Sequence, residues 1–330
     1  MSVPVIAFFN NKGGVGKTSL VYHLAWMYSD MGVRVLAADL DPQANLTAAF
    51  LDEERLEQLW PDGEHTQTVF GAVQPLLRGV GDIGDAHIEK IDFKLGLLVG
   101  DLSLSRFEDP LAEVWPKCSD GDERAFRVMS AFWRMMQKAA ATDGVSLVLM
   151  DLGPNLGAIN RAALISADDV VIPLSPDLFS LQGLRNLGPT LRRWRKEWGD
   201  RVPKNPAPGL PLPSGRMQPL GYIVLQHSVR LDRPVKAYDR WIARIPREYR
   251  EAVLGEQDVK AEFATDPHRL KLVKHYHSLM PLAQEAHKPM FHLRSADGAI
   301  GAHLQAVQAV YGDFKELARA IATRAGIPTP

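Results

Sequence analysis

The sequence predicts an α/β fold with a doubly wound, mostly parallel sheet and helices on both faces. Two observations indicate it. Short apolar runs without polar alternation recur along the 330 residues, and stretches with helical spacing of apolar residues follow them. Strands that are apolar on both faces are typical of parallel sheets covered by helices. With 46% hydrophobic residues, the length allows one large domain with insertions as readily as two domains. We expect a single domain over residues 1–330.

The first forty residues predict the unit that sets the architecture. Residues 3–9 form an apolar run, residues 10–16 are rich in glycine, and residues 17–31 have helical periodicity up to Gly32. A second apolar run, at 33–38, ends at Asp39. Two buried strands joined through a helix form a βαβ unit with a parallel pair and a right-handed crossover.

The same alternation returns later in the chain. The predicted strands there are 145–150, 170–174 and 220–225, and the predicted helices begin near 158 and span 181–198. Six prolines between 203 and 219 predict an irregular loop. Residues 230–290 are charged and helix-like without a clear strand, so we expect a basic, helical insertion there.

A glycine-rich motif between the first strand and the first helix predicts a phosphate site and a P-loop NTPase type of sheet. Its residues are Lys12, Gly13, Gly14, Val15, Gly16, Lys17, Thr18 and Ser19. A loop at this position turns backbone N–H groups inward, and the helix N-terminus adds the positive end of its dipole. Lys17 is expected to reach the β- and γ-phosphates, and the Thr18 hydroxyl to bind Mg²⁺.

The start of this motif departs from the common P-loop pattern, because Asn11 stands where the first glycine is usual. Asn10-Asn11-Lys12 followed by Gly-Gly-Val-Gly-Lys-Thr resembles the deviant Walker A motif of the ParA/MinD family of P-loop ATPases, in its ParA/Soj-like form. The resemblance implies a slow, partner-stimulated ATPase. It also implies that Lys12 reaches the nucleotide of the second subunit in an ATP-dependent homodimer, so that Lys12 and Lys17 both serve catalysis. A second cation beside the triphosphate would offset developing charge, as an arginine finger does.

Carboxylates after two predicted strands extend the resemblance. Residues 38–47 are similar to the family's DxDPQGNxT segment, with Ala44 in place of glycine. The resemblance implies that Asp41 orients the attacking water and that Asp39 lies close to the water shell of the metal. The apolar run ending at Asp151 is a Walker B pattern, which places Asp151 near Mg²⁺. After it, Gly153 stands where the family has a proline.

The resemblance is strong over 3–50 and 144–187 and plausible at 219–227 and near the C-terminus. It is absent from 52–140 and 230–285. We therefore expect residues 52–140 to form an enlarged insertion between the Asp39/Asp41 segment and the Walker B strand. Residues near Gln226 and Pro289 are candidates for base contacts.

Positive charge is concentrated in the middle of the chain, although the net charge is only −1. Residues 1–184 hold 14 Lys and Arg against 25 Asp and Glu, whereas residues 185–250 hold 15 against 5, a net +10. Basic surface of this kind binds DNA without sequence preference in ParA-like proteins, and phosphate neutralisation would make the affinity fall with salt. A solvated helix face is the alternative. The candidate DNA-binding residues are Arg192, Arg193, Arg195, Arg233, Lys236, Arg240, Arg244 and Arg247. Trp194, Trp198 and Trp241 lie among them and are expected to pack in the core or against an insertion.

Three functions are compatible with these features. The first is a partition or cargo-positioning ATPase that binds non-specific DNA in its ATP state and responds to a ParB-like or other activating protein. The second is a MinD-like or other regulatory ATPase that acts on proteins without DNA, and the third a metabolic enzyme on the same scaffold. The single cysteine, Cys118, excludes a cysteine-ligated metal cluster and favours a reducing compartment. No signal h-region or membrane span is apparent, so we expect a cytoplasmic protein that associates with the nucleoid if it binds DNA.

Overall fold

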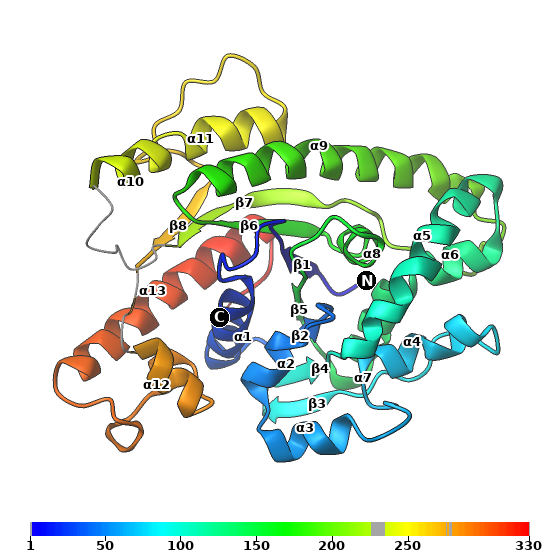
Figure 1. Cartoon of the computed structure of the whole chain (residues 1–330), viewed down its shortest axis with the longest axis horizontal. Coiled ribbons are helices and arrows are strands. Elements are labelled where there is room, and N and C mark those ends of the chain that lie inside the picture. Colours follow the sequence, from blue (N-terminus) through cyan, green and yellow to red (C-terminus); the bar gives the residue numbers. More distant parts are fainter. Residues whose placement is uncertain (1, 226–234, 275, 277–278, 330) are drawn as a thin grey trace.

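The computed structural model describes residues 2–225, 235–274, 276 and 279–329. Its eight-stranded sheet has the order β3-β4-β2-β5-β1-β6-β7-β8, and every neighbouring pair is parallel except β3 with β4 (Figure 1). The strands are β1 Val5–Phe8, β2 Val35–Asp39, β3 Glu89–Asp92, β4 Leu95–Leu98, β5 Leu147–Asp151, β6 Asp169–Leu174, β7 Gln218–Leu225 and β8 Arg269–Val273. The predicted doubly wound sheet is confirmed.

Side chains of each central strand alternate between two cores, one on each face of the sheet. In β1, Val5 and Ala7 pack into one core, while Ile6 and Phe8 pack into the other. All four are fully buried. Successive residues of a strand point to opposite faces, so a strand buried on both sides has no polar position. This is why the apolar runs lack alternation.

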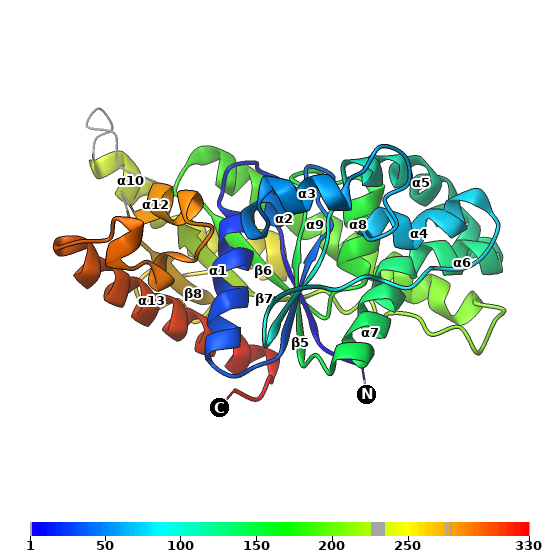
Figure 2. The ribbon, with the colours of Figure 1, turned by 90° about the horizontal axis from the view of Figure 1, so that it is seen from below.

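Helices cover both faces (Figure 2). One layer consists of α1 Lys17–Asp30, α2 Asn45–Phe50, α3 Glu53–Leu59, α12 Leu279–Glu285 and α13 Ala302–Ala325. The other consists of α4 Val69–Arg78, α5 Glu108–Lys117, α6 Glu123–Met129, α7 Ala131–Asp143, α8 Ala158–Ile165, α9 Leu178–Arg201 and α11 Ile245–Glu248. A further helix, α10 Val235–Ile242, precedes α11. None of the described helices combines the length and apolar composition needed to cross a bilayer.

Most predicted boundaries agree with the structure within a few residues. The first helix ends at Asp30, and Gly32 follows with a φ of +85°, a conformation that glycine adopts readily. Residues 205–217 hold neither helix nor strand, which agrees with the proline-rich loop.

The expectation that residues 230–290 lack a strand is wrong. β8 lies in this stretch and extends the sheet by pairing in parallel with β7. Its sequence, RLKLV, alternates charged and apolar residues, and its charged residues are only partly buried. An edge strand of this kind does not have the continuous apolar run by which the central strands are recognised. Residues 52–140 likewise supply strands, since β4 pairs in parallel with β2.

Candidate functional site

The glycine-rich loop joins the carboxyl end of β1 to the N-terminus of α1, at a switch point of the sheet where ligands bind in folds of this class. Gly14 and Gly16 have φ values of +70° and +76°. Gly16 precedes the helix without a side-chain cap, and no acidic residue lies in the first turn of α1. The first amides of the helix are therefore suited to an anion.

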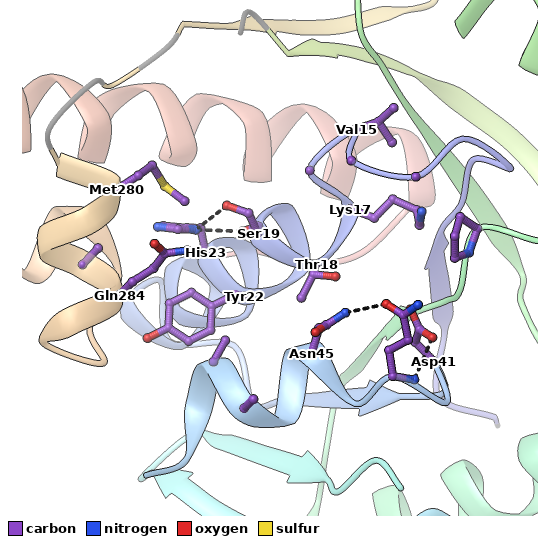
Figure 3. Close-up of a pocket in the computed structure, with 18 of the residues that line it drawn as sticks. Val15, Lys17, Thr18, Ser19, Tyr22, His23, Asp41, Asn45, Met280 and Gln284 are labelled. Atoms are coloured by element: carbon purple, nitrogen blue, oxygen red, sulfur yellow. Dashed lines mark hydrogen bonds between the residues drawn. The ribbon is translucent and has the colours of Figure 1, made fainter. Parts of the chain in front are cut away.

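A cavity of about 660 Å³ opens over this loop (Figure 3). The loop residues Gly13 to Ser19 form its floor, while Asp41 and Asn45 come from the end of β2 and the start of α2. Met280 and Gln284 of α12 line its far end, beyond Tyr22 and His23 of α1. The structure thus brings the predicted phosphate-binding residues and Asp41 to one cavity.

Lys17 is buried at the base of the cavity, where its ammonium group lies 3.4 Å from the carbonyl oxygen of Lys12. Burial lowers its pKa, while the carboxylates of Asp151 and Asp41 act in the opposite direction. A buried lysine with one weak contact is suited to pairing with an anion.

Asp151 and Thr18 meet beneath the loop. The Thr18 hydroxyl donates to Oδ2 of Asp151 at 2.7 Å, and Oδ1 of Asp151 is buried without a hydrogen-bond partner among the described residues. Burial, followed by repulsion from Asp39, raises the pKa of Asp151 to about 8. An uncompensated carboxylate beside a hydroxyl fits a divalent cation. Within the described ranges, no three His, Cys, Asp or Glu side chains form a metal site by themselves.

The Asp39 carboxylate is held by hydrogen bonds to residues of the segment that follows β2. Its Oδ2 accepts hydrogen bonds from the backbone N–H and the hydroxyl of Thr47, both at 2.8 Å, and its Oδ1 accepts from the N–H of Asp41 at 3.3 Å. Burial raises its pKa to about 7. These contacts favour a supporting role in which Asp39 fixes α2 and the Asp41 turn, and its predicted place near the metal stays a prediction.

Asp41 lies at the mouth of the cavity, and its Oδ1 accepts from the backbone of Gln43 at 3.0 Å. The next turn passes through Ala44, whose φ is +53°. This left-handed conformation explains physically why a glycine suits the position in the resembled segment. Gly153 packs against Asp41, because a Cβ on Gly153 would lie 3.1 Å from Oδ1 of Asp41.

Lys12 is engaged within its own chain. Its side chain forms an ion pair with Asp177, the residue that precedes α9. Asn10 positions this part of the loop, since its side chain accepts from the Lys12 N–H at 3.0 Å and donates to the Pro173 carbonyl at 2.7 Å. The inter-subunit contact of Lys12 stays a prediction.

Several of the candidate DNA-binding arginines have structural partners. The guanidinium groups of Arg192 and Arg195 donate to backbone carbonyls of residues 252–253 and 216–217, and Arg244 and Arg247 pair with Glu248 and Glu251. Arg193 and Arg240 are exposed. Arg233 and Gln226 lie outside the described residues, as does the side chain of Lys236. Trp194 and Trp198 are buried, which confirms their expected packing role.

Three functional candidates were missed by the sequence analysis. Glu108 reaches the start of α8, Asp177 holds Lys12, and His23 links α1 to the backbone of Met290. The capping position of Asp177, just before a helix, was the one available signal. Glu108 lies 50 residues from its contact, and no local pattern marks such a pair.

Comparison with known proteins agrees with this geometry. A family model described as an AAA domain matches residues 3–203. Protein IncC of Escherichia coli is 30% identical over 188 residues, which cover 57% of this chain and 45% of that protein. The chromosome partitioning protein ParA of Caulobacter vibrioides is 30% identical over 198 residues, covering 60% and 66%. The chain thus spans about half to two thirds of the length of these curated relatives.

Solved structures show the same fold at low sequence identity. Protein DIP2308 of Corynebacterium diphtheriae superposes with a TM-score of 0.72 at 22% identity, over 98% of both chains. A Cyanothece McdA variant in complex with ATP gives 0.65 at 16% identity, over 100% of this chain and 98% of McdA. From the family match and the loop geometry together, the chain belongs to the AAA-domain family, as a member of the ParA/MinD group with a deviant Walker A motif.

Proposed function

We propose that this protein is a ParA-like ATPase that works as an ATP-dependent dimerising switch in DNA partition or cargo positioning. One observation supports this most. Lys17, Thr18 and Asp41 line one cavity floored by the loop, and Asp151 lies beneath it, in contact with the Thr18 hydroxyl and close to the charge of Lys17. This is the set of groups that binding and hydrolysis of a nucleoside triphosphate require.

Each side chain has a distinct part in the proposed reaction. The loop amides and Lys17 bind the phosphate oxygens and hold them in place. Thr18 and Asp151 would hold Mg²⁺, which when bound neutralises phosphate charge. Asp41 orients the attacking water, with Gly153 packed against its carboxylate. ATP is the proposed nucleotide, as in the Cyanothece McdA complex and the AMPPNP-bound putative plasmid partition protein of Borrelia burgdorferi.

The switch itself depends on a second copy of the chain. In the ATP state Lys12 leaves Asp177 and reaches the nucleotide of the partner subunit, which couples dimerisation to hydrolysis. Hydrolysis is slow alone and is stimulated by a ParB-like or other activating protein. The protein acts in the cytoplasm, on the nucleoid in its DNA-bound form.

Non-specific DNA binding is the least supported part of this proposal. Arg192, Arg195, Arg244 and Arg247 keep their charge while they make their structural contacts, so they still contribute to a positive surface. Arg193 and Arg240 are the exposed candidates. The extensive internal pairing favours a second candidate function, a regulatory ATPase of the MinD kind that acts on a protein partner without DNA.

Nucleotide binding and dimerisation test the core of the proposal. Wild-type protein should bind a fluorescent ATP analogue with Mg²⁺ and sediment as a dimer, and Lys17→Ala should abolish the binding. Lys196→Ala is the matched control, because Lys196 is an exposed lysine of α9. Unchanged affinity in Lys17→Ala would exclude the site.

DNA retention separates the two candidate functions. If DNA is bound, Arg193→Glu combined with Arg240→Glu should weaken ATP-dependent retention. The slope of the logarithm of the affinity against the logarithm of the salt concentration should also decrease by the amount expected for about two phosphate contacts. An ATP-bound dimer that shows no salt-sensitive DNA retention would favour the protein-partner function.

A further inference from the structure

The helix that follows the Walker B strand begins without a cap of its own. Gly157 occupies the N-cap position of α8 and has no side chain to offer. The carboxylate of Glu108, the first residue of α5, takes this role: Oε1 accepts from the N–H of Ala158 at 2.5 Å and Oε2 from that of Ile159 at 2.8 Å. A carboxylate at a helix N-terminus satisfies free amides and interacts favourably with the helix dipole.

Gly157 makes room for this distant cap. A Cβ at this position would lie 2.4 Å from Oε1 of Glu108, closer than real Cβ atoms approach. The backbone of Gly157 is extended, with a φ of −78°, so it is not strained. Glycine is therefore needed at position 157 because a side chain would block Glu108, and not because the backbone conformation is unusual.

Within the first turn of α8, Asn160 holds the loop between the Walker B strand and the helix. Asn160 is buried, and its Nδ2 lies within hydrogen-bond distance of the Gly153 carbonyl at 2.9 Å and of the Asn155 carbonyl at 2.7 Å. The loop it fixes borders the catalytic cavity through Pro154, which lies between the two residues that Asn160 contacts. Gly153 packs against Asp41, and Pro154 lines the cavity beside Gly13.

These contacts form a continuous path from α5 to Asp41. Glu108 fixes the start of α8, Asn160 of that helix fixes the loop, and the loop bounds the space around the Asp41 carboxylate. α5 packs on α6 and α8, and its buried residues Leu111 and Val114 belong to the same core as α8.

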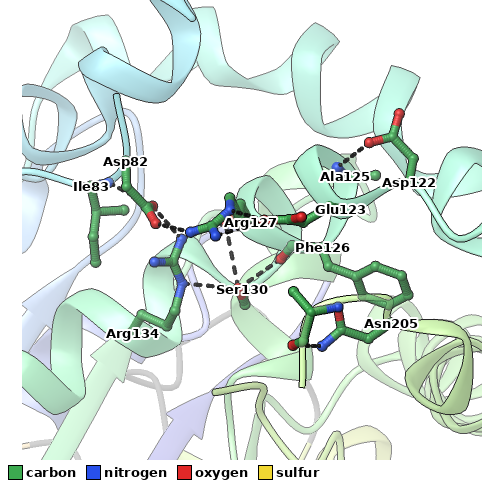
Figure 4. Close-up of polar contacts among 11 residues, drawn as sticks. Asp82, Ile83, Asp122, Glu123, Ala125, Phe126, Arg127, Ser130, Arg134 and Asn205 are labelled. Atoms are coloured by element: carbon green, nitrogen blue, oxygen red, sulfur yellow. Dashed lines mark hydrogen bonds and ion pairs between the residues drawn. The ribbon is translucent and has the colours of Figure 1, made fainter. Parts of the chain in front are cut away.

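Next to α5, the helices α6 and α7 are joined to Asp82 by a polar cluster (Figure 4). Arg134 of α7 is buried and donates to the Ser130 hydroxyl at 3.1 Å, to Asp82 at 2.7 Å and to the Arg127 carbonyl at 2.8 Å. Arg127 of α6 pairs with the second oxygen of Asp82. A satisfied network of this kind rigidifies the elements it joins. α5 packs against α6 of this network and caps α8 through Glu108.

We propose that Glu108 and Asn160 are positioning residues of the hydrolytic site, through which the placement of α5 sets the loop beside Asp41. This inference rests on the proposed ATPase function. Residues 52–140, which include α5, can thus change the rate of hydrolysis through Glu108. Nucleotide affinity should stay the same, because the path ends at Asp41 and does not include Lys17 or the amides of the phosphate loop.

Variants of Glu108 test the path. Glu108→Ala removes both acceptors, and Glu108→Gln keeps one of them. Glu113→Gln is the matched control, since Glu113 is an exposed residue of the same helix that pairs with Lys117. We expect Glu108→Ala to lower single-turnover kcat about fivefold to tenfold, in line with the loss of a charge-assisted cap. Glu108→Gln should lie between it and wild type, and Kd for the ATP analogue should change less than about twofold.

Hydrogen exchange gives a readout that does not need hydrolysis. Amides of residues 153–159 should exchange faster in Glu108→Gln than in Glu113→Gln, with the strands unchanged. In a double-mutant cycle, Glu108→Gln and Asn160→Asp should be less than additive in kcat, because both interrupt one path.

Two results would overturn the inference: wild-type kcat in Glu108→Ala, or parallel losses of kcat and affinity in Glu108→Gln together with a lower Tm. Wild-type protein that binds ATP without hydrolysing it would instead reject the proposed function. In that case the exchange measurement still decides whether Glu108 positions the loop.

Discussion

Lys12 and Asp177 form an ion pair that closes one side of the phosphate loop within a single chain. Asp177 also caps α9, since its Oδ1 accepts from the Ser180 N–H at 2.9 Å. The side chains of both residues are about three-quarters buried, with exposed fractions of 25% and 22%. A lysine expected to serve a second subunit is thus already paired, and its transfer requires that this pair opens.

Asp177→Asn should therefore promote the dimer. Asparagine is as good a helix cap as aspartate, so α9 keeps its cap while the charge that holds Lys12 is lost. Opening one partly exposed ion pair weakens dimerisation by a factor of about three in the equilibrium constant. Two such pairs open per dimer, so without them the dimer dissociation constant with ATP should fall about tenfold. Analytical ultracentrifugation over a concentration series measures it. If Asp177→Asn tightens the dimer equally in a Lys12→Ala background, the effect does not pass through Lys12.

Asp41→Asn should separate binding from hydrolysis. The substitution keeps the size of the side chain and an oxygen that can accept from Gln43, but it removes the negative charge that orients a water. Hydrolysis should fall by about 100-fold or more, as for the loss of a general base or water-positioning group, while ATP-analogue affinity is retained. A phosphate-release assay beside equilibrium binding checks this, and wild-type turnover would remove Asp41 from the mechanism.

His23 should make the fold sensitive to acid. Its Nδ1 lies 2.7 Å from the Ser19 carbonyl and its Nε2 accepts from the Met290 N–H at 3.2 Å, so the folded protein needs the neutral ring. Burial, with a smaller contribution from the nearby His292, lowers its pKa to about 4, although the hydrogen bond to the Ser19 backbone acts in the opposite direction. Because the unfolded chain binds this proton more readily, the contribution is complete above about pH 6.5 and is lost as the pH falls towards 4.

Protonation of His23 should lower the free energy of unfolding by about 3 kcal/mol at most. Urea unfolding between pH 4 and 7 should show a steeper loss of stability in wild type than in His23→Gln, whose side chain does not titrate. Equal slopes in the two proteins would place the acid sensitivity elsewhere.

Ala44→Gly should stabilise the protein. Ala44 holds a φ of +53° just before α2, and its N–H donates to the Asp41 carbonyl at 2.8 Å. A residue with a Cβ is disfavoured by about 1 kcal/mol in this conformation, and glycine is not. Ala48→Gly, at an exposed site within α2, is the control, and it should lower the free energy of unfolding by about 1 kcal/mol because glycine is a poor helix former. Thermal unfolding compares them, and a loss of stability in Ala44→Gly would contradict the argument.

Local chemistry made most of the fold and the phosphate site predictable. The apolar runs predicted β1, β2, β5, β6 and β7, because full burial leaves no polar position in them. The Walker A and Walker B motifs predicted Lys17, Thr18 and Asp151 as site residues, and the structure brings these three side chains close together. β8 was missed because an edge strand is only half buried, and Glu108 because its contact joins residues far apart in sequence. The pairing of Lys12 with Asp177 also depends on tertiary geometry, since 165 positions separate the two.

The register of the sheet places Asp39 directly beside Asp151 at the ends of β2 and β5. Both are fully buried, and after burial itself the negative charge of Asp39 is the next contribution to the raised pKa of Asp151. Two buried carboxylates side by side cost stability, which protons or a neighbouring positive charge such as that of Lys17 offset. If Mg²⁺ binds beside Asp151 as proposed, binding recovers part of this cost, so heat resistance without the ion and readiness to bind it oppose each other at these two side chains.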